Sequence, residues 1–399
     1  MEEAMILRYP SYYKRFSCIA QRCEDTCCAG WEIDIDDRSY QYYMSVEGEF
    51  GERLRRSIRE YRPEDQDVYE SHGFILGEDR RCPFLDGEGL CDLYRELGEE
   101  ALCDVCTDTP RNFLEYGGAR EISISAACAE AGRLIYTEAE RITFVEEETM
   151  EELDWEEGEE EKRLAHQIRW ARDRAIRILQ NRQVPIEKRI QQYLSFSEEV
   201  QDCLNANEPE RISGISWEPY LSCPEKAEEV QGRSAREEGQ YQMFLQRMVT
   251  YTRLDSVSEE WESLLRQLQE KFVEPENGAS LYARAHRRLR QELAAEKREY
   301  EYEHLMVYHV FTCQARCVDD FDFIGKAKLA VVSYLMIRDL DALRLLVRGS
   351  YEREDRVDIA RIYAREVEHS EENLEFLADE FLFEEAYSPE SLRRTIPAP

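Results

Sequence analysis

The stretch Cys18-Ile-Ala-Gln-Arg-Cys-Glu-Asp-Thr-Cys-Cys-Ala-Gly-Trp31 places four cysteines within eleven residues. Cysteine can pack in a protein core as a small apolar side chain. Core packing does not explain two adjacent cysteines, Cys27 and Cys28, that follow Arg, Glu, Asp and Thr. The stretch therefore predicts that these thiols hold a ligand.

The 13 cysteines are concentrated at the N-terminal end of the chain. The nine that precede residue 129 are Cys18, Cys23, Cys27, Cys28, Cys82, Cys91, Cys103, Cys106 and Cys128. The other four are Cys203, Cys223, Cys313 and Cys317, for which we expect core packing. No secretory signal is visible at the start of the sequence, so we expect a cytoplasmic location and free thiols instead of disulfides.

A second cysteine block has the spacing of metal ligands. It runs from Cys82-Pro-Phe-Leu through Cys91 to Cys103-Asp-Val-Cys106. Closely spaced thiolates chelate either structural zinc or an iron–sulfur cluster. His72 is the single histidine in the first 142 residues, so an all-thiolate site is expected, and this suits either metal. We take all nine N-terminal cysteines as candidate ligands, against the alternative of free or buried thiols without metal.

The formal net charge of −34 restricts the classes of partner. It disfavours a nucleic-acid backbone or an anionic membrane surface, and it favours a basic partner or a lysine-bearing substrate. The alternative is that the charge serves solubility alone, and the charge by itself does not decide between the two. The longest strongly apolar run, Leu329–Ile337, is too short to span a bilayer. We therefore expect neither nucleic acid nor membrane as a partner.

Composition and periodicity predict a mainly α protein with a cysteine-rich N-terminal domain over residues 1–142 and an α-helical domain over 164–399. Residues 143–163 lie between them as an acidic linker, since 11 of the 16 residues in 146–161 are acidic. Within the N-terminal domain, residues 111–116 and 119–124 predict a β-hairpin with a Gly-Gly turn.

Shorter patterns place individual elements. Residues 31–35 alternate apolar and acidic residues and predict a short strand, and the Asp36–Ser39 stretch offers helix caps. Residues 126–136 predict a helix that Cys128 opens. In the C-terminal half, one apolar face of a long helix consists of Leu164, Ile168, Ala171, Ala175 and Leu179.

Acids and aromatics near the double cysteine could serve a methylated or sulfonium ligand. The acids are Asp34, Asp36 and Asp37, and the aromatics are Trp31, Tyr40, Tyr42 and Tyr43. The alternative interpretation is structural, because acids after a short strand commonly cap helices and aromatics at helical spacing commonly fill a core. The sequence identifies no catalytic residue and no cofactor-binding residue other than the candidate thiols.

Taken together, these residues resemble the flagellin lysine-N-methylase family. The matching N-terminal stretches are 18–33, 82–106, Thr109-Pro-Arg111 and 121–133. Two weaker C-terminal stretches, Tyr302–Phe311 and Ala364–His369, also match, so that the resemblance covers nearly the whole chain. The family often has Pro where this chain has Ala129, which leaves the preceding sulfur in place.

The resemblance implies transfer of a methyl group from S-adenosylmethionine to lysine side chains of flagellin or a similar surface protein. It also implies an iron–sulfur cluster, of the 4Fe-4S type, held by cysteines among the nine. Zinc remains the alternative metal. A non-catalytic metal- or cluster-binding sensor or interaction protein is the alternative function, and a redox enzyme is a third.

Two common S-adenosylmethionine signatures are missing from the sequence. No Gly-x-Gly-x-Gly follows a predicted strand, which disfavours an ordinary Rossmann methyltransferase. The Cys-x-x-x-Cys-x-x-Cys triad is also incomplete, because Gly30 stands where its third cysteine belongs. Any open iron that binds the cofactor would therefore be held by a different arrangement of thiols.

Overall fold

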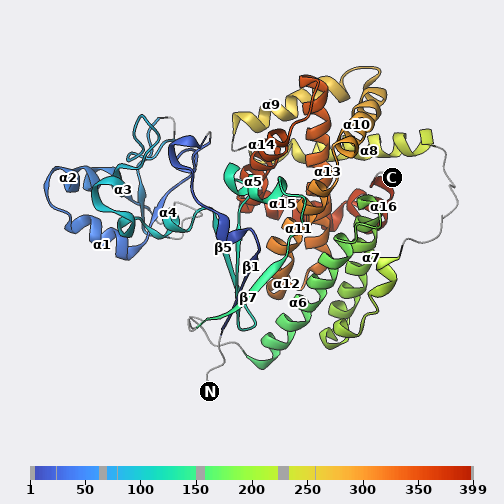
Figure 1. Ribbon diagram of the computed structural model, residues 1–399, viewed down its shortest axis with the longest axis horizontal. Coiled ribbons are helices and arrows are strands. Elements are labelled where there is room, and N and C mark those ends of the chain that lie inside the picture. The colour runs from blue at the N-terminus through green and yellow to red at the C-terminus, as the bar shows by residue number, and fades with distance from the viewer. Residues whose placement is uncertain are drawn as a thin grey trace. The chain divides into compact units, whose positions relative to one another are not determined.

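The computed structural model describes residues 5–23, 25–62, 70–78, 80–149, 158–222, 233–256 and 258–396. These residues form a mainly helical protein with small sheets (Figure 1), which confirms the helical part of the predicted fold class. The chain divides into two compact units. The helical unit comprises Met1–Lys14, Phe113–Ala127 and Gly132–Pro399, and the N-terminal unit comprises Arg15–Asn112 and Cys128–Ala131.

A four-stranded sheet in the helical unit has the strand order β5-β6-β1-β7. Its strands are β1 (Met5–Pro10), β5 (Arg111–Tyr116), β6 (Ala119–Ile124) and β7 (Phe144–Thr149). Strand β1 pairs parallel to β6, with Ile6 opposite Ala119, and antiparallel to β7. Gly117 and Gly118 both have positive φ, at 57° and 70°, as a tight two-residue hairpin turn requires.

The predicted hairpin is therefore confirmed, but its place in the fold differs from the prediction. From Phe113 onward it belongs to the helical unit, because β6 pairs with β1 at the start of the chain. The predicted domain ranges consequently do not coincide with the compact units. A pairing between residues more than 100 positions apart leaves no local signal in the sequence.

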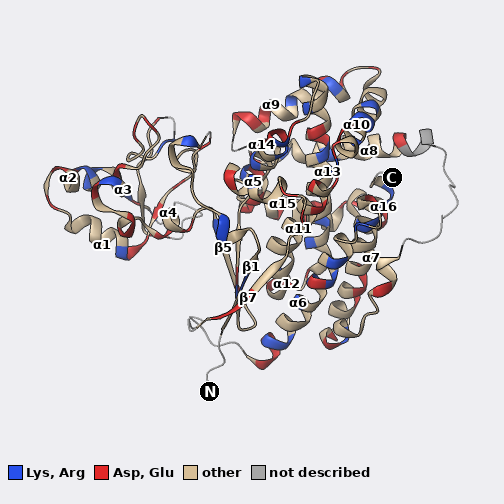
Figure 2. Cartoon of the chain, in the orientation of Figure 1, with Lys and Arg blue, Asp and Glu red and all other residues tan. Residues whose placement is uncertain are grey.

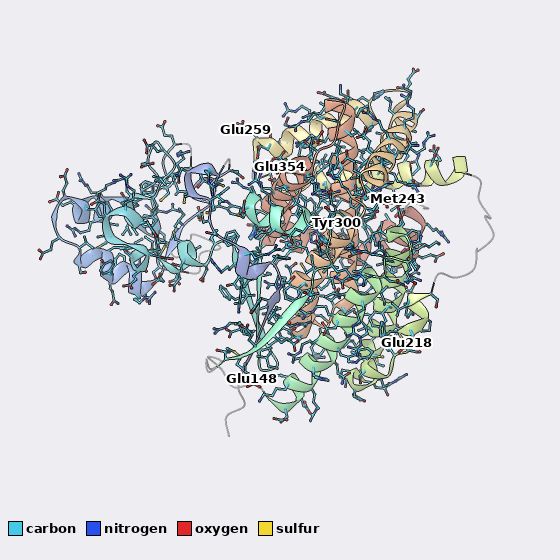
Figure 3. The ribbon with its side chains drawn as sticks, in the orientation of Figure 1. Glu148, Glu218, Met243, Glu259, Tyr300 and Glu354 are labelled. Carbon is cyan, nitrogen blue, oxygen red and sulfur yellow. The ribbon has the colours of Figure 1, made fainter. Side chains whose placement is uncertain are left out.

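The predicted acidic linker also differs in part from the structure. Its first residues form β7, and its last ones begin a helix at Glu159, while residues 150–157 lie outside the described residues. Basic partners on the neighbouring segment offset the acids of β7: Glu146 pairs with Arg8 at 3.3 Å, and Glu147 pairs with Lys14 at 2.8 Å. The next acid of the strand, Glu148, is exposed (Figure 3).

The helices that contribute to the helical unit are α5 (Ala129–Tyr136), α6 (Glu159–Leu179), α7 (Ile186–Asn205), α8 (Arg233–Tyr251), α9 (Glu259–Leu268), α10 (Gly278–Ala295), α11 (Tyr300–Cys313), α12 (Cys317–Asp320), α13 (Phe323–Arg348), α14 (Arg353–Tyr363), α15 (Glu371–Phe383) and α16 (Pro389–Thr395). The five predicted apolar-face residues of α6 are all buried. Helix α13 packs against α7, α10, α11, α14 and α15, so its burial on many sides fits its weak amphipathicity.

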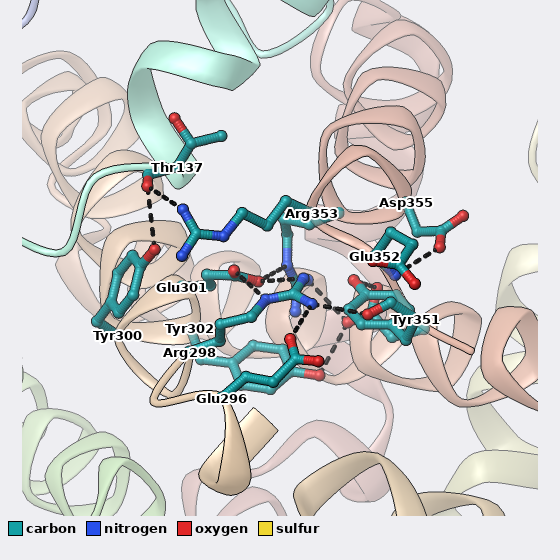
Figure 4. A network of polar contacts seen from close by, with 12 residues as sticks. Thr137, Glu296, Arg298, Tyr300, Glu301, Tyr302, Tyr351, Glu352, Arg353 and Asp355 are labelled. Atoms are coloured by element: carbon teal, nitrogen blue, oxygen red, sulfur yellow. Dashed lines mark hydrogen bonds and ion pairs between the residues drawn. The ribbon is translucent and has the colours of Figure 1, made fainter. Parts of the chain in front are cut away.

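Several buried charges of the helical unit are paired within the unit. The Arg356 guanidinium lies 2.7 Å from the Asp341 carboxylate, which also accepts hydrogen bonds from Tyr302 and Tyr351. Nearby, Arg298 pairs with Glu301 at 2.7 Å (Figure 4). Such networks are costly to break, because each lost partner leaves a charge buried and uncompensated.

The N-terminal unit is built from short elements. Its helices are α1 (Asp37–Ser45), α2 (Gly48–Ser57), α3 (Asp92–Leu97) and α4 (Asp104–Asp108). Its sheet has the order β2-β4-β3, formed by β2 (Asp34–Ile35), β3 (Ile58–Glu60) and β4 (His72–Phe74). The strand predicted over residues 31–35 is thus limited to its last two residues.

Acidic and basic side chains are interspersed along the helices of both units (Figure 2). No helix within the described ranges is both long and apolar enough to cross a membrane.

Candidate functional site

Backbone contacts of the N-terminal unit bring Cys28, Cys82 and Cys91 together. The N–H of Cys82 donates to the carbonyl of Cys28 at 2.8 Å. The Cys82–Cys91 segment then folds back on itself, since Leu85 forms an isolated β-bridge with Cys91. The turn depends on the Asp86 carboxylate, which accepts from the N–H of Leu90 at 2.9 Å. Local turn chemistry therefore brings Cys82 and Cys91, nine residues apart in the sequence, close enough for their thiols to interact electrostatically.

Cys103 and Cys106 approach the same core through α4. Cys103 caps this helix, and its sulfur lies 3.4 Å from the sulfur of Cys106. Asp36 anchors the helix to α1, because its carboxylate accepts from the N–H groups of both Ser39 and Asp104. One hydrophobic core cluster includes all five thiols, which we name the core thiol set: Cys28, Cys82, Cys91, Cys103 and Cys106.

The other four predicted ligands form a second group, the outer thiol set. Its members are Cys18, Cys23, Cys27 and Cys128. The thiols of Cys23 and Cys18 are close enough to Cys128 to raise its pKa, after the larger effect of burial. Cys27 in turn interacts with Cys18 and Cys128. The structure therefore divides the nine thiols into five and four.

The adjacent cysteines Cys27 and Cys28 connect the two sets. A hydrogen bond between their thiols lowers the pKa of Cys28 and raises the pKa of Cys27. The Arg81 guanidinium further lowers the pKa of Cys28. Sequence reasoning did not single out Arg81, although its position directly before Cys82 was a visible signal.

Two opposing effects act on the remaining thiols. Burial raises the pKa of Cys82 to about 12 and also raises the pKa values of Cys91 and Cys128. Backbone N–H groups two or three residues further on favour the thiolates instead. They belong to Phe84 for Cys82, to Leu93 and Tyr94 for Cys91, and to Glu130 and Ala131 for Cys128. A bound cation would remove the cost of burying these anions.

Thiolate sulfur, the donor that both sets offer, is the ligand that structural zinc and iron–sulfur clusters commonly take. The 3.4 Å between the sulfurs of Cys103 and Cys106 is near the ~3.8 Å edge of a tetrahedral zinc–thiolate site. Among the side chains that the structure describes, no group of three or more His, Cys, Asp or Glu stands ready as a ligand set. The two sets are thus gatherings of thiols and not preformed coordination shells.

Four of the acids and aromatics near the double cysteine, Asp34, Asp36, Tyr40 and Tyr43, have structural roles. Asp36 caps α1, and Asp34 accepts a hydrogen bond from Tyr61 at 2.8 Å. Tyr43 is buried and donates to the carbonyl of Ala101, while Tyr40 stacks on His72. These contacts favour the interpretation as caps and core over an aromatic ligand wall.

The later cysteines agree with the expected core packing where the structure describes them. Cys203 and Cys317 are buried in the helical unit, and Cys313 is partly buried at the end of α11. Cys223 lies outside the described residues.

The fold and the thiols together define a class of protein in which a small thiol-bearing unit accompanies a large helical unit. Residues 172–393, more than half of the chain, match the family model of the FliB lysine N-methylase C-terminal domain. The chain therefore belongs to the FliB lysine N-methylase family, as its resemblance predicted.

Curated relatives match a smaller part of the chain. A lysine-N-methylase of Salmonella typhimurium is 27% identical over 143 residues, which are 34% of this chain and 34% of that protein. The flagellar biosynthetic protein FliU of Salmonella muenchen is 26% identical over 146 residues, 35% of this chain and 82% of that protein. The match thus spans about a third of the length of the lysine-N-methylase. No solved structure matches the chain significantly.

Proposed function

We propose that this protein is a protein-lysine N-methyltransferase that acts on flagellin or a similar surface protein. The observation that carries the proposal is the match of residues 172–393 to the FliB lysine N-methylase family. The formal net charge of −34 supports it, because an acidic protein attracts lysine-rich substrates. The name of the FliU relative supports a flagellar substrate.

The cofactors are part of the same proposal. S-adenosylmethionine would supply the methyl group as an electrophilic sulfonium carbon. The core thiol set would hold an iron–sulfur cluster of the 4Fe-4S type, with zinc as the alternative, and the outer thiol set offers four further sulfurs. The metal part of the proposal is supported by the grouping of nine thiols in two sets, neither of which contains a histidine.

The chain's own residues have three tasks in this reaction. They must hold the metal with thiolates, bind a cationic lysine, and take the proton that the ammonium loses before its nitrogen can attack a methyl carbon. The backbone N–H groups at Cys82, Cys91 and Cys128 serve the first task, because they favour the thiolate form.

Methyl transfer can be tested directly with the full chain. We expect anaerobically purified protein, incubated with methyl-labelled S-adenosylmethionine and flagellin from the same cell, to place label on flagellin lysines. Peptide mapping identifies the modified residues, and iron, sulfide and zinc analysis identifies the metal. The Cys203→Ser variant controls for the loss of a thiol outside both thiol sets, since it removes a buried thiol of the helical unit.

Two outcomes would contradict the proposal. Protein with a full complement of metal that transfers no label would instead support the non-catalytic metal-binding alternative. Active, colourless protein that carries stoichiometric zinc would overturn the iron–sulfur part and leave lysine methylation intact.

A further inference from the structure

Two stretches that lie more than 50 residues apart meet at one carboxylate in the helical unit. Tyr308 in α11 donates a hydrogen bond to Glu368 Oε2 at 2.6 Å. The same tyrosine oxygen accepts from the N–H of Ala126 at 3.0 Å, which fixes the tyrosine as the donor toward the carboxylate. His309 Nδ1 lies 3.7 Å from the other carboxylate oxygen, beyond hydrogen-bond distance. Glu368 Oε1 is therefore left without a close partner.

The charge of Glu368 is not compensated by a cation. Within the described ranges, no Lys or Arg side chain lies at ion-pair distance from it. Its side chain is nevertheless 16% exposed, so a ligand can reach it. Buried carboxylates elsewhere in this unit, such as Asp341, are paired with arginine. An unpaired carboxylate in such surroundings is a site for a cation.

Two residues near the carboxylate carry polar atoms without a partner. Among the described residues, the Tyr136 hydroxyl and His309 Nε2 are buried and have no hydrogen-bond partner. The Tyr136 side chain is close enough to Glu368 for the carboxylate to raise the pKa of Tyr136, after the larger effect of burial. Tyr363 and Cys313 are also close enough for the Glu368 charge to raise their pKa values, after the larger effect of burial. Buried hydroxyls and imidazoles that lack a partner call for an explanation, and a bound polar ligand is one that fits beside an unpaired carboxylate.

His309 and the tyrosines near Glu368 are neutral near pH 7. Burial lowers the pKa of His309 to about 3, so this imidazole carries no charge. Burial also raises the pKa values of Tyr136, Tyr308 and Tyr363. The pKa of Glu368 itself is raised to about 7 by burial, against the hydrogen bond from Tyr308.

The backbone at this carboxylate is also unusual. Residues Ala364–Glu368 form a π-helical turn after α14, and the N–H of His369 donates to the carbonyl of Ala364. Single π turns inside helices frequently occur at functional sites. His369 Nε2 lies 2.6 Å from the Ser125 hydroxyl, so the turn is tied to the segment that directly precedes Cys128 in the sequence.

We propose that Glu368, positioned by Tyr308, forms a binding site for a protonated primary amine and acts there as the base that deprotonates it. The inference rests on the proposed function, in which the amine is a lysine side chain. The proton moves from the ammonium nitrogen to Glu368 Oε1, which yields a neutral amine and a neutral carboxylic acid. The nitrogen lone pair is then free to attack an electrophilic carbon. Glu368 is the catalytic residue and Tyr308 is a positioning residue.

Amine binding can be measured without methyl transfer, with n-butylamine as the probe. We expect the full chain to bind n-butylammonium at pH 8 and the Glu368→Gln variant to bind it ~10-fold more weakly or worse, because a charge-assisted contact is lost. Glu380→Gln is the matched control, since its carboxylate is already paired with Arg253 at 2.9 Å. Equal affinities of wild type and Glu368→Gln would overturn the proposal.

The pH dependence of methyl transfer gives a second test. We expect kcat/KM of the wild type to rise with pH through about 7 and then level off, as Glu368 loses its proton. Glu368→Gln should lower kcat/KM at pH 8 by ~100-fold or more. Tyr308→Phe should move the rise to higher pH, because the lost hydrogen bond favours the carboxylate. An unchanged profile in both variants contradicts the proposal.

The two tests separate this inference from the proposed function. If the wild type methylates no flagellin but binds n-butylammonium through Glu368, the proposed function fails and the amine site stands. If methylation occurs and Glu368→Gln leaves it intact, the amine site fails and the proposed function stands.

Discussion

The two units of this protein differ in the polar groups that they bury and in how these groups are paired. The helical unit contains helices of up to 26 residues, and it pairs arginines such as Arg356 and Arg172 with carboxylates inside its own core. The N-terminal unit has helices of 5 to 10 residues, and its core cluster holds five thiols. Arg81 lowers the pKa of one of these, Cys28, by its positive charge.

This difference indicates which interactions stabilise each unit. The helical unit compensates buried charges such as Arg356 and Arg172 with its own carboxylates, and so needs no bound cation at these positions. The N-terminal unit has about 100 residues, a small core and short elements. In a unit of this kind, an additional cross-link contributes much to the free energy of unfolding. We therefore propose that a bound metal or cluster stabilises the N-terminal unit and contributes little to the helical unit.

Removal of one core thiol should have the largest effect. We expect Cys82→Ser to lose the metal of the core thiol set, to destabilise the N-terminal unit and to reduce methyl transfer at least ~100-fold. Metal analysis and hydrogen exchange would show this, with protection lost over residues 15–112 and kept in α13. The Cys203→Ser control should keep its metal. Unchanged metal content in Cys82→Ser would contradict the difference drawn between the units.

Breaking a buried ion pair should have the next largest effect and should act on the other unit. We expect Asp341→Asn to destabilise the helical unit by about 3–5 kcal/mol, because the buried Arg356 guanidinium loses its closer carboxylate and keeps only Glu301, 3.6 Å from its Nε. Denaturant unfolding measures the loss, and metal content should not change. The control is Glu354→Gln, which breaks an exposed pair with Arg133 and should cost less than about 1 kcal/mol.

The raised pKa of Glu368 predicts a smaller, pH-dependent effect. Folding raises the pKa of the Glu368 carboxyl from 4.5 to about 7. The folded state is therefore favoured while this carboxyl is protonated, and that contribution to the free energy of unfolding is lost as the pH rises from 4.5 to about 7. Glu368→Gln should therefore be more stable than the wild type at pH 8, by at most about 3 kcal/mol. The difference should shrink at pH 5.5. Thermal unfolding at both values checks this, and a pH-independent difference would refute the assignment.

The smallest effect is expected at the cap of α1. Asp36→Ala removes the acceptor for the N–H groups of Ser39 and Asp104, and it should destabilise the N-terminal unit by about 1–2 kcal/mol. Because Asp36 has a structural role here, KM for the lysine substrate should stay the same. A large increase in KM at unchanged stability would restore Asp36 as a substrate-binding acid.

Local patterns in the sequence predicted much of this protein. The apolar face of α6, the Asp36 cap and the Gly117-Gly118 hairpin follow from periods of 3.6 or 2 and from turn chemistry, which act over a few residues. The nine cysteines could be named as candidate ligands because their spacing is also a local pattern of the sequence. Their assignment to a metal stays a prediction.

Only the tertiary structure decided how distant segments combine. The pairing of β1 with β6 places the hairpin in the helical unit. The hydrogen bond from the N–H of Cys82 to the carbonyl of Cys28 holds these two cysteines together. The hydrogen bond from Tyr308 to Glu368 joins two distant C-terminal stretches. Such contacts depend on the packing of whole units and not on the residues next to them in sequence. The sequence by itself therefore determined which chemical groups this protein has, and the fold decided which of them meet.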